Sequence, residues 1–370
     1  MKNSVQMGPG DMIPAFLLFF IVHSVQLGVG IHGFQRIIYQ EAKQDAWISI
    51  LLAGLATHIV AIFMLKTLKM YGMNDLYGIH QAIFGKWIGN FLNVLYILYL
   101  STAFFAVLRN YIEVVQTWVF PNLNTWFLAV SLLFIVIYSF TGGLRVIVGI
   151  SFFSVILSIW LFPLMAFPMK YVELGHLLPV LEADLMEILK GVHSMTFTII
   201  GFEILYVIYP YVKDKEHAKK PVHLALLFTT LIYLGIMLIT LTFFSGEQLR
   251  KTIWATLSLF GIVKFPFVER IEYMVVCFWM LIILPNLSLL VWAAFRGTRR
   301  LVEVNAFKFV GLFSLVIFIA SILLKTRSQI NTFNDYYSRV AFYIAFVYPI
   351  ILFAIAAATR KFKRHKEQVE

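Results

Sequence analysis

The segment Gly28-Val29-Gly30-Ile31-His32-Gly33 interrupts the first apolar stretch of the chain, Asp11 to Ile38, and it decides the fold. The residues before it are almost all apolar from Met12 onward, which is long enough to begin crossing a bilayer as a helix. Glycine weakens a helix interior and lets other atoms approach the backbone. A broken helix at membrane depth is tolerated only where it is buried in protein or lines a cavity, and transporters use such breaks as substrate sites. We expect this stretch to form the first half of a binding site.

Two other interpretations of the same glycines have to be weighed. Gly28, Gly30 and Gly33 match the dinucleotide-binding pattern, but that pattern needs a preceding strand and a βαβ unit, and a long apolar segment precedes it here. The glycines could also serve only close packing between helices. The packing interpretation stays open beside the binding site.

Composition places the chain in a membrane. Of its 370 residues 61% are hydrophobic and 13% charged, whereas a soluble chain carries about 25% charged residues. The single cysteine, Cys277, excludes an internal disulfide framework and a cysteine-based zinc site. The net charge of +11 lies in loops between apolar segments, where the positive-inside rule explains it without nucleic acid.

The apolar segments predict an all-α integral membrane protein with about ten transmembrane helices. We expect the first of them to stay in the protein and not to be cleaved as a signal peptide. The chain reads as one bundle over residues 1–370, with no separate soluble domain. The expected spans are 11–38, 45–68, 88–117, 125–140, 146–168, 188–211, 220–245, 270–296, 306–324 and 336–358. Lys and Arg gather in the loops on one side, which predicts that both termini are cytoplasmic, as an even number of spans requires.

Ten spans divide into two halves of five, about 11–168 and 188–358. In transporters of that plan the first helix of each half is broken. The sixth span reads Thr196-Phe197-Thr198-Ile199-Ile200-Gly201-Phe202-Glu203, so a glycine, two threonines and a carboxylate again lie near mid-membrane. We therefore predict a five-plus-five inverted repeat with helices 1 and 6 broken at mid-membrane.

Glu203 is the most informative single position. An ionised carboxylate in hydrocarbon is costly, so an intramembrane acid faces a cavity, finds a partner or stays protonated. Three roles stay open: a proton site, a ligand contact, or a stabiliser of the adjacent broken helix. A structural acid bonded only to protein is the fourth.

Other polar residues within the third span form two possible pairs. Arg109 and Glu113 lie four residues apart, share one helix face and can pair, most simply as a structural pair at the outer interface. Tyr96 and Tyr99 lie three apart and could point their hydroxyls inward, although aromatic packing explains them equally well.

The remaining polar residues suggest binding more than catalysis. Asn286 follows Pro285, which frees a backbone carbonyl that the amide could satisfy, or the amide could contact a ligand. His23, His58 and His193 are scattered, without the spacing of a helical metal site. We find no nucleophile–base pair, phosphate loop or metal cluster, so we expect no enzyme, no cofactor and no metal.

The outer connection from Ser245 to Glu269 contains the apolar run Trp254 to Phe260. It is too apolar for a solvated loop and too short to span the bilayer twice. We expect it to pack along the membrane surface or against a partner.

In motif order and spacing the chain resembles the B subunit of spore germinant receptors, a branch of the amino acid–polyamine–organocation transporter superfamily. The resemblance covers essentially the whole chain. It rests on the motifs Leu27-Gly28-Val29-Gly30, Gly85-Lys86-Trp87-Ile88-Gly89, Gly201-Phe202-Glu203, Trp254 to Phe260 and Glu269-Arg270-Ile271-Glu272.

The resemblance implies the five-plus-five fold and a small germinant, often an amino acid, although a sugar or nucleoside stays open. It also implies a complex with a membrane-anchored A subunit and a lipoprotein C subunit in the spore inner membrane. The ligand-binding residues that it implies are Gly28, Val29, Gly30, Tyr99, Ala103, Ile200, Gly201 and Asn286.

Three functions remain: a receptor subunit that senses its ligand, a proton-coupled amino-acid transporter with Glu203 as the proton site, and a structural membrane scaffold without a ligand.

Overall fold

The chain is a bundle of helices. The computed structural model describes residues 12–266 and 268–369, with side chains as far as Lys361. In these residues β-pairing is limited to two isolated bridges, Ile13 with Val212 and Phe265 with Val268. The predicted all-α class is confirmed.

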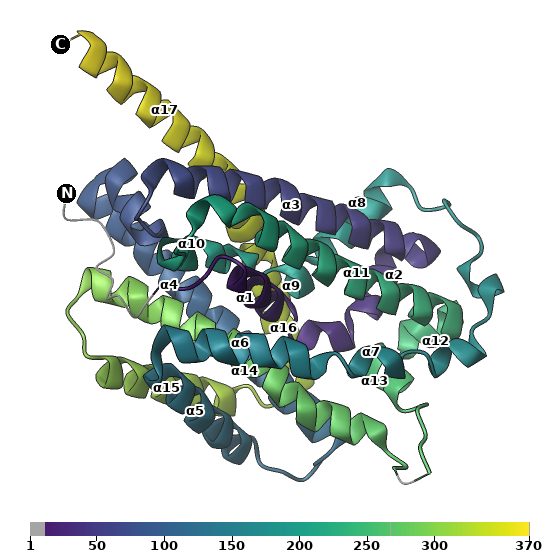
Figure 1. The fold of residues 1–370 in the computed structure, drawn as a ribbon. Coiled ribbons are helices and arrows are strands. Elements are labelled where there is room, and N and C mark those ends of the chain that lie inside the picture. The colour runs from purple at the N-terminus through teal and green to yellow at the C-terminus, as the bar shows by residue number, and fades with distance from the viewer. Residues whose placement is uncertain (1–11, 267, 370) are drawn as a thin grey trace.

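The α-helices, in chain order, are α1 (Leu17–Gln26), α2 (Phe34–Ala42), α3 (Ala46–Tyr71), α4 (Leu76–Trp118), α5 (Thr125–Thr141), α6 (Gly143–Ser158), α7 (Leu161–Leu164), α8 (Leu185–Ser194), α9 (Thr196–Ile199), α10 (Leu205–Ile208), α11 (Lys219–Phe243), α12 (Gly246–Lys251), α13 (Ala255–Phe260), α14 (Ile271–Leu301), α15 (Ala306–Leu323), α16 (Arg327–Phe342) and α17 (Tyr348–Val369). In Figure 1 the long helices α3, α11 and α6 run along one common direction.

Seven segments of the described chain are long and apolar enough to cross a membrane, and α1 and α5 are shorter apolar helices. The expected sixth span is not among these seven segments, because its helix is divided into the short pieces from α8 to α10. The structure thus contains a helical segment for each of the ten expected spans.

Both predicted helix breaks are present. After α1 the chain leaves helical geometry at Leu27 and Gly28, forms the 3₁₀ turn η1 (Val29–His32) and resumes as α2. In the sixth segment α9 ends before Ile200, which is extended, and Gly201 has φ +114° before the 3₁₀ turn η5 (Phe202–Ile204). That positive φ explains the glycine, since L side chains rarely adopt it.

The two ends of the bundle can be named after Asp75 and Asp45. The Asp75 end holds the α3–α4 turn and the C-terminal part of α14, because Asp75 and Arg300 form an ion pair of 2.9 Å there. Burial raises the pKa of the Asp75 carboxyl, and the Arg300 guanidinium opposes that rise. The Asp45 end lies across the bilayer, since the 26 residues of α3 separate the two acids.

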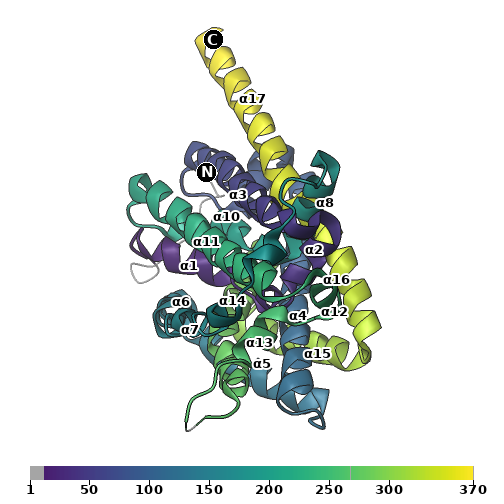
Figure 2. The ribbon, with the colours of Figure 1, turned by 90° about the vertical axis from the view of Figure 1, so that its right-hand side faces the viewer.

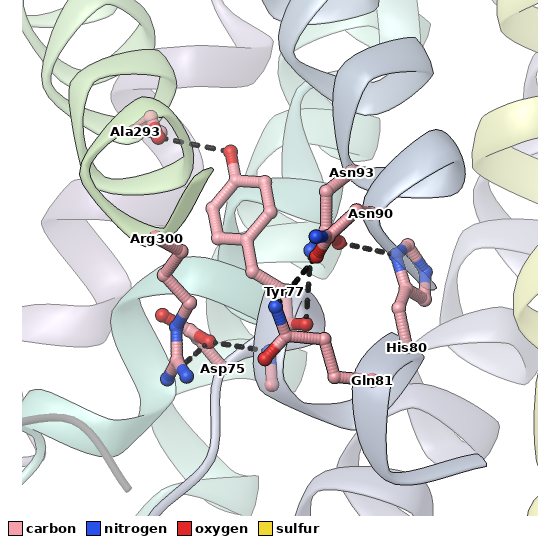
Figure 3. A network of polar contacts seen from close by, with 9 residues as sticks. Asp75, Tyr77, His80, Gln81, Asn90, Asn93, Ala293 and Arg300 are labelled. Atoms are coloured by element: carbon pink, nitrogen blue, oxygen red, sulfur yellow. Dashed lines mark hydrogen bonds and ion pairs between the residues drawn. The ribbon is translucent and has the colours of Figure 1, made fainter. Parts of the chain in front are cut away.

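A short helical hairpin closes the Asp75 end (Figure 3). Gly85, at φ +77°, divides α4 into a short first helix and a long second one. The two pieces touch so closely that a Cβ at Gly89 would lie 2.8 Å from the backbone of Gln81. The hydroxyl of Tyr77 donates to the Ala293 carbonyl of α14 at 2.9 Å. The short helix is thereby fixed to α14.

A chain of polar side chains extends this closure to the last span. The Asn93 amide donates to the Tyr77 carbonyl at 3.2 Å, which turns its oxygen toward Nδ1 of His80, 2.7 Å away. On its other side His80 bonds the hydroxyl of Tyr348 at 2.5 Å. The hairpin is therefore tied to α14 on one side and to α17 on the other.

The structure corrects two expectations. The run Trp254 to Phe260 is neither on the membrane surface nor free for a partner, because α13 is mostly buried and packs against η1, α11 and α14. The expected Arg109–Glu113 pair is replaced: the Glu113 carboxylate bonds Arg327 at 2.6 Å, and Arg109 donates to the Leu324 carbonyl at 3.0 Å. An apolar sequence pattern does not show whether lipid or protein covers a helix. The spacing of two charges on one helix does not show whether a third charge on another helix pairs with one of them.

The contact between Tyr77 and α14 gives a stability prediction. A Cβ at Gly297 would lie 2.5 Å from the Tyr77 ring, so Gly297→Ala pushes the short helix away. We expect a loss of about 1–3 kcal/mol of unfolding free energy, measured by reversible unfolding in mixed micelles. Gly311→Ala on α15 is the matched control, since a Cβ there meets open space. Equal stability of the two variants would contradict the close contact.

Candidate functional site

A cavity lies where the two helix breaks meet. It has a volume of about 50 Å³, several times the 10–15 Å³ that one water needs. Its lining comes from α1, η1, α4, the broken sixth segment, α14 and α16. The lining residues are Val25, Gln26, Gly28, Val29, Gly30, Ala103, Ala106, Val107, Asn110, Phe197, Thr198, Ile200, Gly201, Glu203, Asn286, Leu290 and Tyr337.

The cavity brings together nearly all of the residues expected from the sequence. Those on its lining are Gly28, Val29, Gly30, Ala103, Ile200, Gly201, Glu203 and Asn286. Tyr99 lies behind Glu203 and is no part of the lining. Sequence reasoning missed Gln26, Asn110 and Tyr337. The available signal was their polarity within spans, because polar groups in lipid require a partner or a function.

Side chains satisfy the carbonyls that the first break exposes. The Asn286 amide donates to the Val25 carbonyl at 2.8 Å, and the Tyr233 hydroxyl bonds the Gln26 carbonyl at 3.0 Å. Both carbonyls belong to the last turn of α1, which has no intrahelical partners to offer them. The break is therefore stabilised within the protein.

The second break is satisfied by Gln26 of the first broken segment and by Tyr233 of α11. The Gln26 amide donates to the Ile199 carbonyl at 2.7 Å, and the Tyr233 hydroxyl also reaches the Thr198 carbonyl at 3.1 Å. Tyr233 and Gln26 thus hold the ends of α1 and α9 together.

Glu203 stabilises the other side of the second break. Its Oε2 accepts from the Gly201 N–H at 2.8 Å, and its Oε1 accepts from the Tyr99 hydroxyl at 2.5 Å. The Tyr96 hydroxyl bonds the Glu203 carbonyl at 3.1 Å. Both tyrosine hydroxyls therefore point inward, but they bind Glu203. Glu203 is 3% exposed and still belongs to the cavity lining.

Two glycines set how closely the broken segments approach. A Cβ at Gly201 would lie 2.6 Å from the Val25 carbonyl oxygen, and one at Gly30 would lie 2.9 Å from Oγ1 of Thr198. Gly28 differs, because its Cβ would meet only Nδ2 of Asn286 at 3.7 Å. Gly30 and Gly201 therefore serve close packing, whereas Gly28 borders open cavity.

Two buried acceptors at the junction have no partner among the described residues. They are Oε1 of Gln26 and Oδ1 of Asn286, whose side chains are 1% and 2% exposed. The assignment of these oxygens follows from chemistry, because each amide nitrogen must face the carbonyl that it bonds. A buried acceptor without a donor costs about 1–3 kcal/mol, so this site favours a ligand or waters that donate hydrogen bonds.

Donors lie close to these acceptors, on the segment that follows α1. No backbone N–H of Gly28, Val29 or Gly30 is bonded to another described residue. The same small cavity therefore presents free acceptors at the end of α1 and in the middle of α14, and free donors at Gly28 and the start of η1. A ligand with separate positive and negative groups is complementary to it.

A larger cavity opens toward the Asp45 end. Its volume is about 550 Å³, and it shares Val29, Gly30, Asn110, Phe197 and Thr198 with the small one. Asn110 and Asn334 cross this boundary as a reciprocal amide pair, with both bonds at 2.9 Å. The small cavity is thus approached from the Asp45 end, while the hairpin of Figure 3 closes the Asp75 end.

In the described part of the chain no three His, Cys, Asp or Glu residues come close enough to hold a metal ion together. Of the histidines singled out above, His23 bonds Thr229 at 2.8 Å and His58 bonds His223 at 2.8 Å. His193 packs against Phe342.

Comparisons with known proteins agree on one family. Residues 12–330 match the profile of a family described as spore germination protein. The chain is 36% identical to spore germination protein GerQB of Bacillus cereus, over 95% of this chain and 98% of that protein. It is 24% identical to spore germination protein YndE of Bacillus subtilis (strain 168), over 94% and 97% of the two chains. Spore germination protein A2 of the same strain is 23% identical, over 92% and 94%.

The contacts of Glu203 predict which variants lose more unfolding free energy. Tyr99→Phe removes a bond to the carboxyl group and should cost about 1 kcal/mol or more of unfolding free energy. Glu203→Gln should cost less, because its oxygen can accept from Gly201 and its amide can donate to Tyr99. Tyr138→Phe, on the exposed face of α5, is the control. Reversible unfolding in mixed micelles measures all three, and equal values for the two tyrosine variants would disprove the bond.

Proposed function

This chain belongs to the spore germination protein family, and on that premise we propose that it is the membrane subunit of a germinant receptor that binds a small nutrient. The ligand is an amino acid with a small apolar side chain. It occupies the cavity between the two helix breaks, and its binding triggers germination.

One observation carries the proposal: Gln26 and Asn286, both on the cavity lining, each hold a buried amide oxygen that has no donor among the described residues. An ammonium group supplies up to three donors and would satisfy both. The negative end of the α1 dipole lies at Gln26 and favours the same positive charge. The ammonium group of the ligand therefore belongs at the junction of α1 and α14.

The rest of the ligand follows from the other walls. The free N–H groups of Gly28 and Gly30 suit a carboxylate. An apolar wall is formed by Ala103, Ala106 and Ile200, so we propose that the ligand has a short apolar side chain that contacts this wall. This wall makes a sugar or a nucleoside a poorer fit, since each would bury hydroxyls without partners.

The closed Asp75 end leaves the ligand cavity open to one side only, as a sensing subunit requires. The ion pair of Asp75 and the bonds of Tyr77 and His80 block that end while the other opens on the larger cavity. We place the Asp45 end outside and both termini in the cytoplasm, in the spore inner membrane. We further propose that the chain passes the signal to an A subunit and a lipoprotein C subunit.

A second candidate is a proton-coupled amino-acid transporter. The observation that favours it is the carboxyl group of Glu203, buried and yet on the cavity lining. Uptake of labelled amino acid into proteoliposomes, driven by a pH gradient and lost in Glu203→Gln, would support transport. Saturable binding without uptake supports the receptor.

The ligand site predicts the effect of filling it. Gly28→Leu places a side chain against Asn286 and into the cavity, so binding should fall below detection while the protein still folds. The measurement is scintillation-proximity binding of labelled glycine, alanine and valine to the purified chain in nanodiscs. The control is Gly235→Leu, since a Cβ at Gly235 on α11 meets open space.

Gly28→Leu with unchanged binding would contradict the site. If none of the three amino acids binds the wild-type chain, the small apolar ligand is wrong. Germination of a null strain that carries this gene, tested against amino acids, sugars and nucleosides, then identifies the ligand class.

A further inference from the structure

The connection between α7 and α8 carries an unusual concentration of exposed apolar side chains. We call residues 168–190 the strap; they comprise the 3₁₀ turns η3 (Pro168–Tyr171) and η4 (Leu174–Leu177), an extended stretch and the first part of α8. Nine large hydrophobic side chains of the strap are between 46% and 76% exposed. The most exposed are Leu181, Leu174 and Leu185. In Figure 2, which looks at the Asp45 end, the strap crosses the near face toward α8.

The strap is held firmly despite its exposure. Asp45, which is buried, accepts from the backbone N–H of Leu181 at 2.7 Å and of Ala183 at 2.9 Å. At its other end the Glu173 N–H donates to the Thr242 carbonyl at 2.8 Å. A surface fixed at both ends loses little conformational entropy when a partner binds it.

These apolar groups do not lie in the hydrocarbon core. Irregular backbone exposed to lipid does not occur there, because its polar groups would be unsatisfied. Apart from the single turn η4, the strap is irregular from Val172 to Asp184, and it is bonded at the ends of two spans, to Asp45 just before α3 and to Thr242 in the last turn of α11. Its apolar side chains therefore lie at or above the membrane surface, where contiguous exposed apolar groups mark interaction sites.

The charge of the strap distinguishes a protein partner from the membrane surface. It carries the acids Glu173, Glu182, Asp184 and Glu187 against two lysines, in a chain whose net charge is +11. Anionic lipid headgroups attract basic segments and repel acidic ones. A protein surface with an apolar centre and a basic rim is complementary to the strap in both respects.

We propose that the strap docks a second protein subunit at the Asp45 end, through its exposed leucines, with Lys or Arg of the partner facing Glu182 and its neighbours. The inference rests on the proposed receptor, in that the partner is another subunit of it with a soluble domain on the outer side. The strap ends in α8, which lines the larger cavity with His193 and Ser194 and continues directly into the broken sixth segment, so a subunit docked there contacts the helix that leads to the ligand cavity.

Photo-crosslinking tests the docking. A photoreactive phenylalanine analogue replaces Leu181 in the full chain, expressed in spores with epitope-tagged A and C subunits. The same substitution at Leu312, similarly exposed but on the lipid-facing side of α15, is the matched control. We expect a crosslink to a tagged subunit from position 181 and lipid adducts alone from position 312. Glu182→Lys should lower the crosslink yield about tenfold or more.

Amino-acid binding by the isolated chain separates this proposal from the ligand site. The double variant Leu174→Ser/Leu181→Ser should lose co-purification of the tagged subunit and keep wild-type binding of the labelled amino acid. Lipid adducts alone from position 181, or co-purification that survives the double variant, would overturn the docking proposal. A wild-type chain that forms the crosslink but binds no amino acid would overturn the ligand and leave the docking in place.

Discussion

In a bilayer, a carbonyl released from a helix has no water to bond, so each helix break has to be completed by the protein itself. The rest of this structure depends on that constraint. Asn286 and Tyr233 donate to the free carbonyls at the end of α1, and Gln26 and Tyr233 donate to those of α9. Glu203 accepts from the N–H of Gly201, where the chain resumes after the second break. Each of these side chains comes from a different segment than the group it satisfies, apart from Glu203. The breaks therefore determine how the helices around them pack.

The same constraint produces the cavity. An amide that donates to a carbonyl turns its oxygen the other way, and the oxygens of Gln26 and Asn286, two residues on the cavity lining, have no donor among the described residues. The scaffold that stabilises the irregular backbone thus generates unsatisfied acceptors beside it. Glycines at 30 and 201 keep the two segments close, whereas Gly28 keeps the space open. Structural support and ligand recognition use the same side chains.

Local sequence signals predicted the helix class and both breaks, because glycine inside an apolar segment weakens the helix at that point. The family resemblance added candidate ligand-binding residues, and eight of the candidate site residues lie on the cavity lining. What could not be predicted depends on partners distant in sequence. Glu113 forms its ion pair with Arg327 and not with Arg109, and Tyr99 bonds Glu203. Tyr233 bonds carbonyls at both breaks. The prediction for the run from Trp254 to Phe260 was wrong because an apolar helix has the same sequence pattern whether lipid or protein covers it.

The central claim is that two interrupted helices meet around a space where backbone and amide groups hold a small zwitterion. A cryo-electron microscopy map of the chain in nanodiscs, saturated with the best-binding amino acid, tests it most directly. The account predicts density for the ligand between Gly28 and Gly201, with its ammonium group against the oxygens of Gln26 and Asn286. Continuous helices at these positions, or side chains filling the space between them, would contradict it.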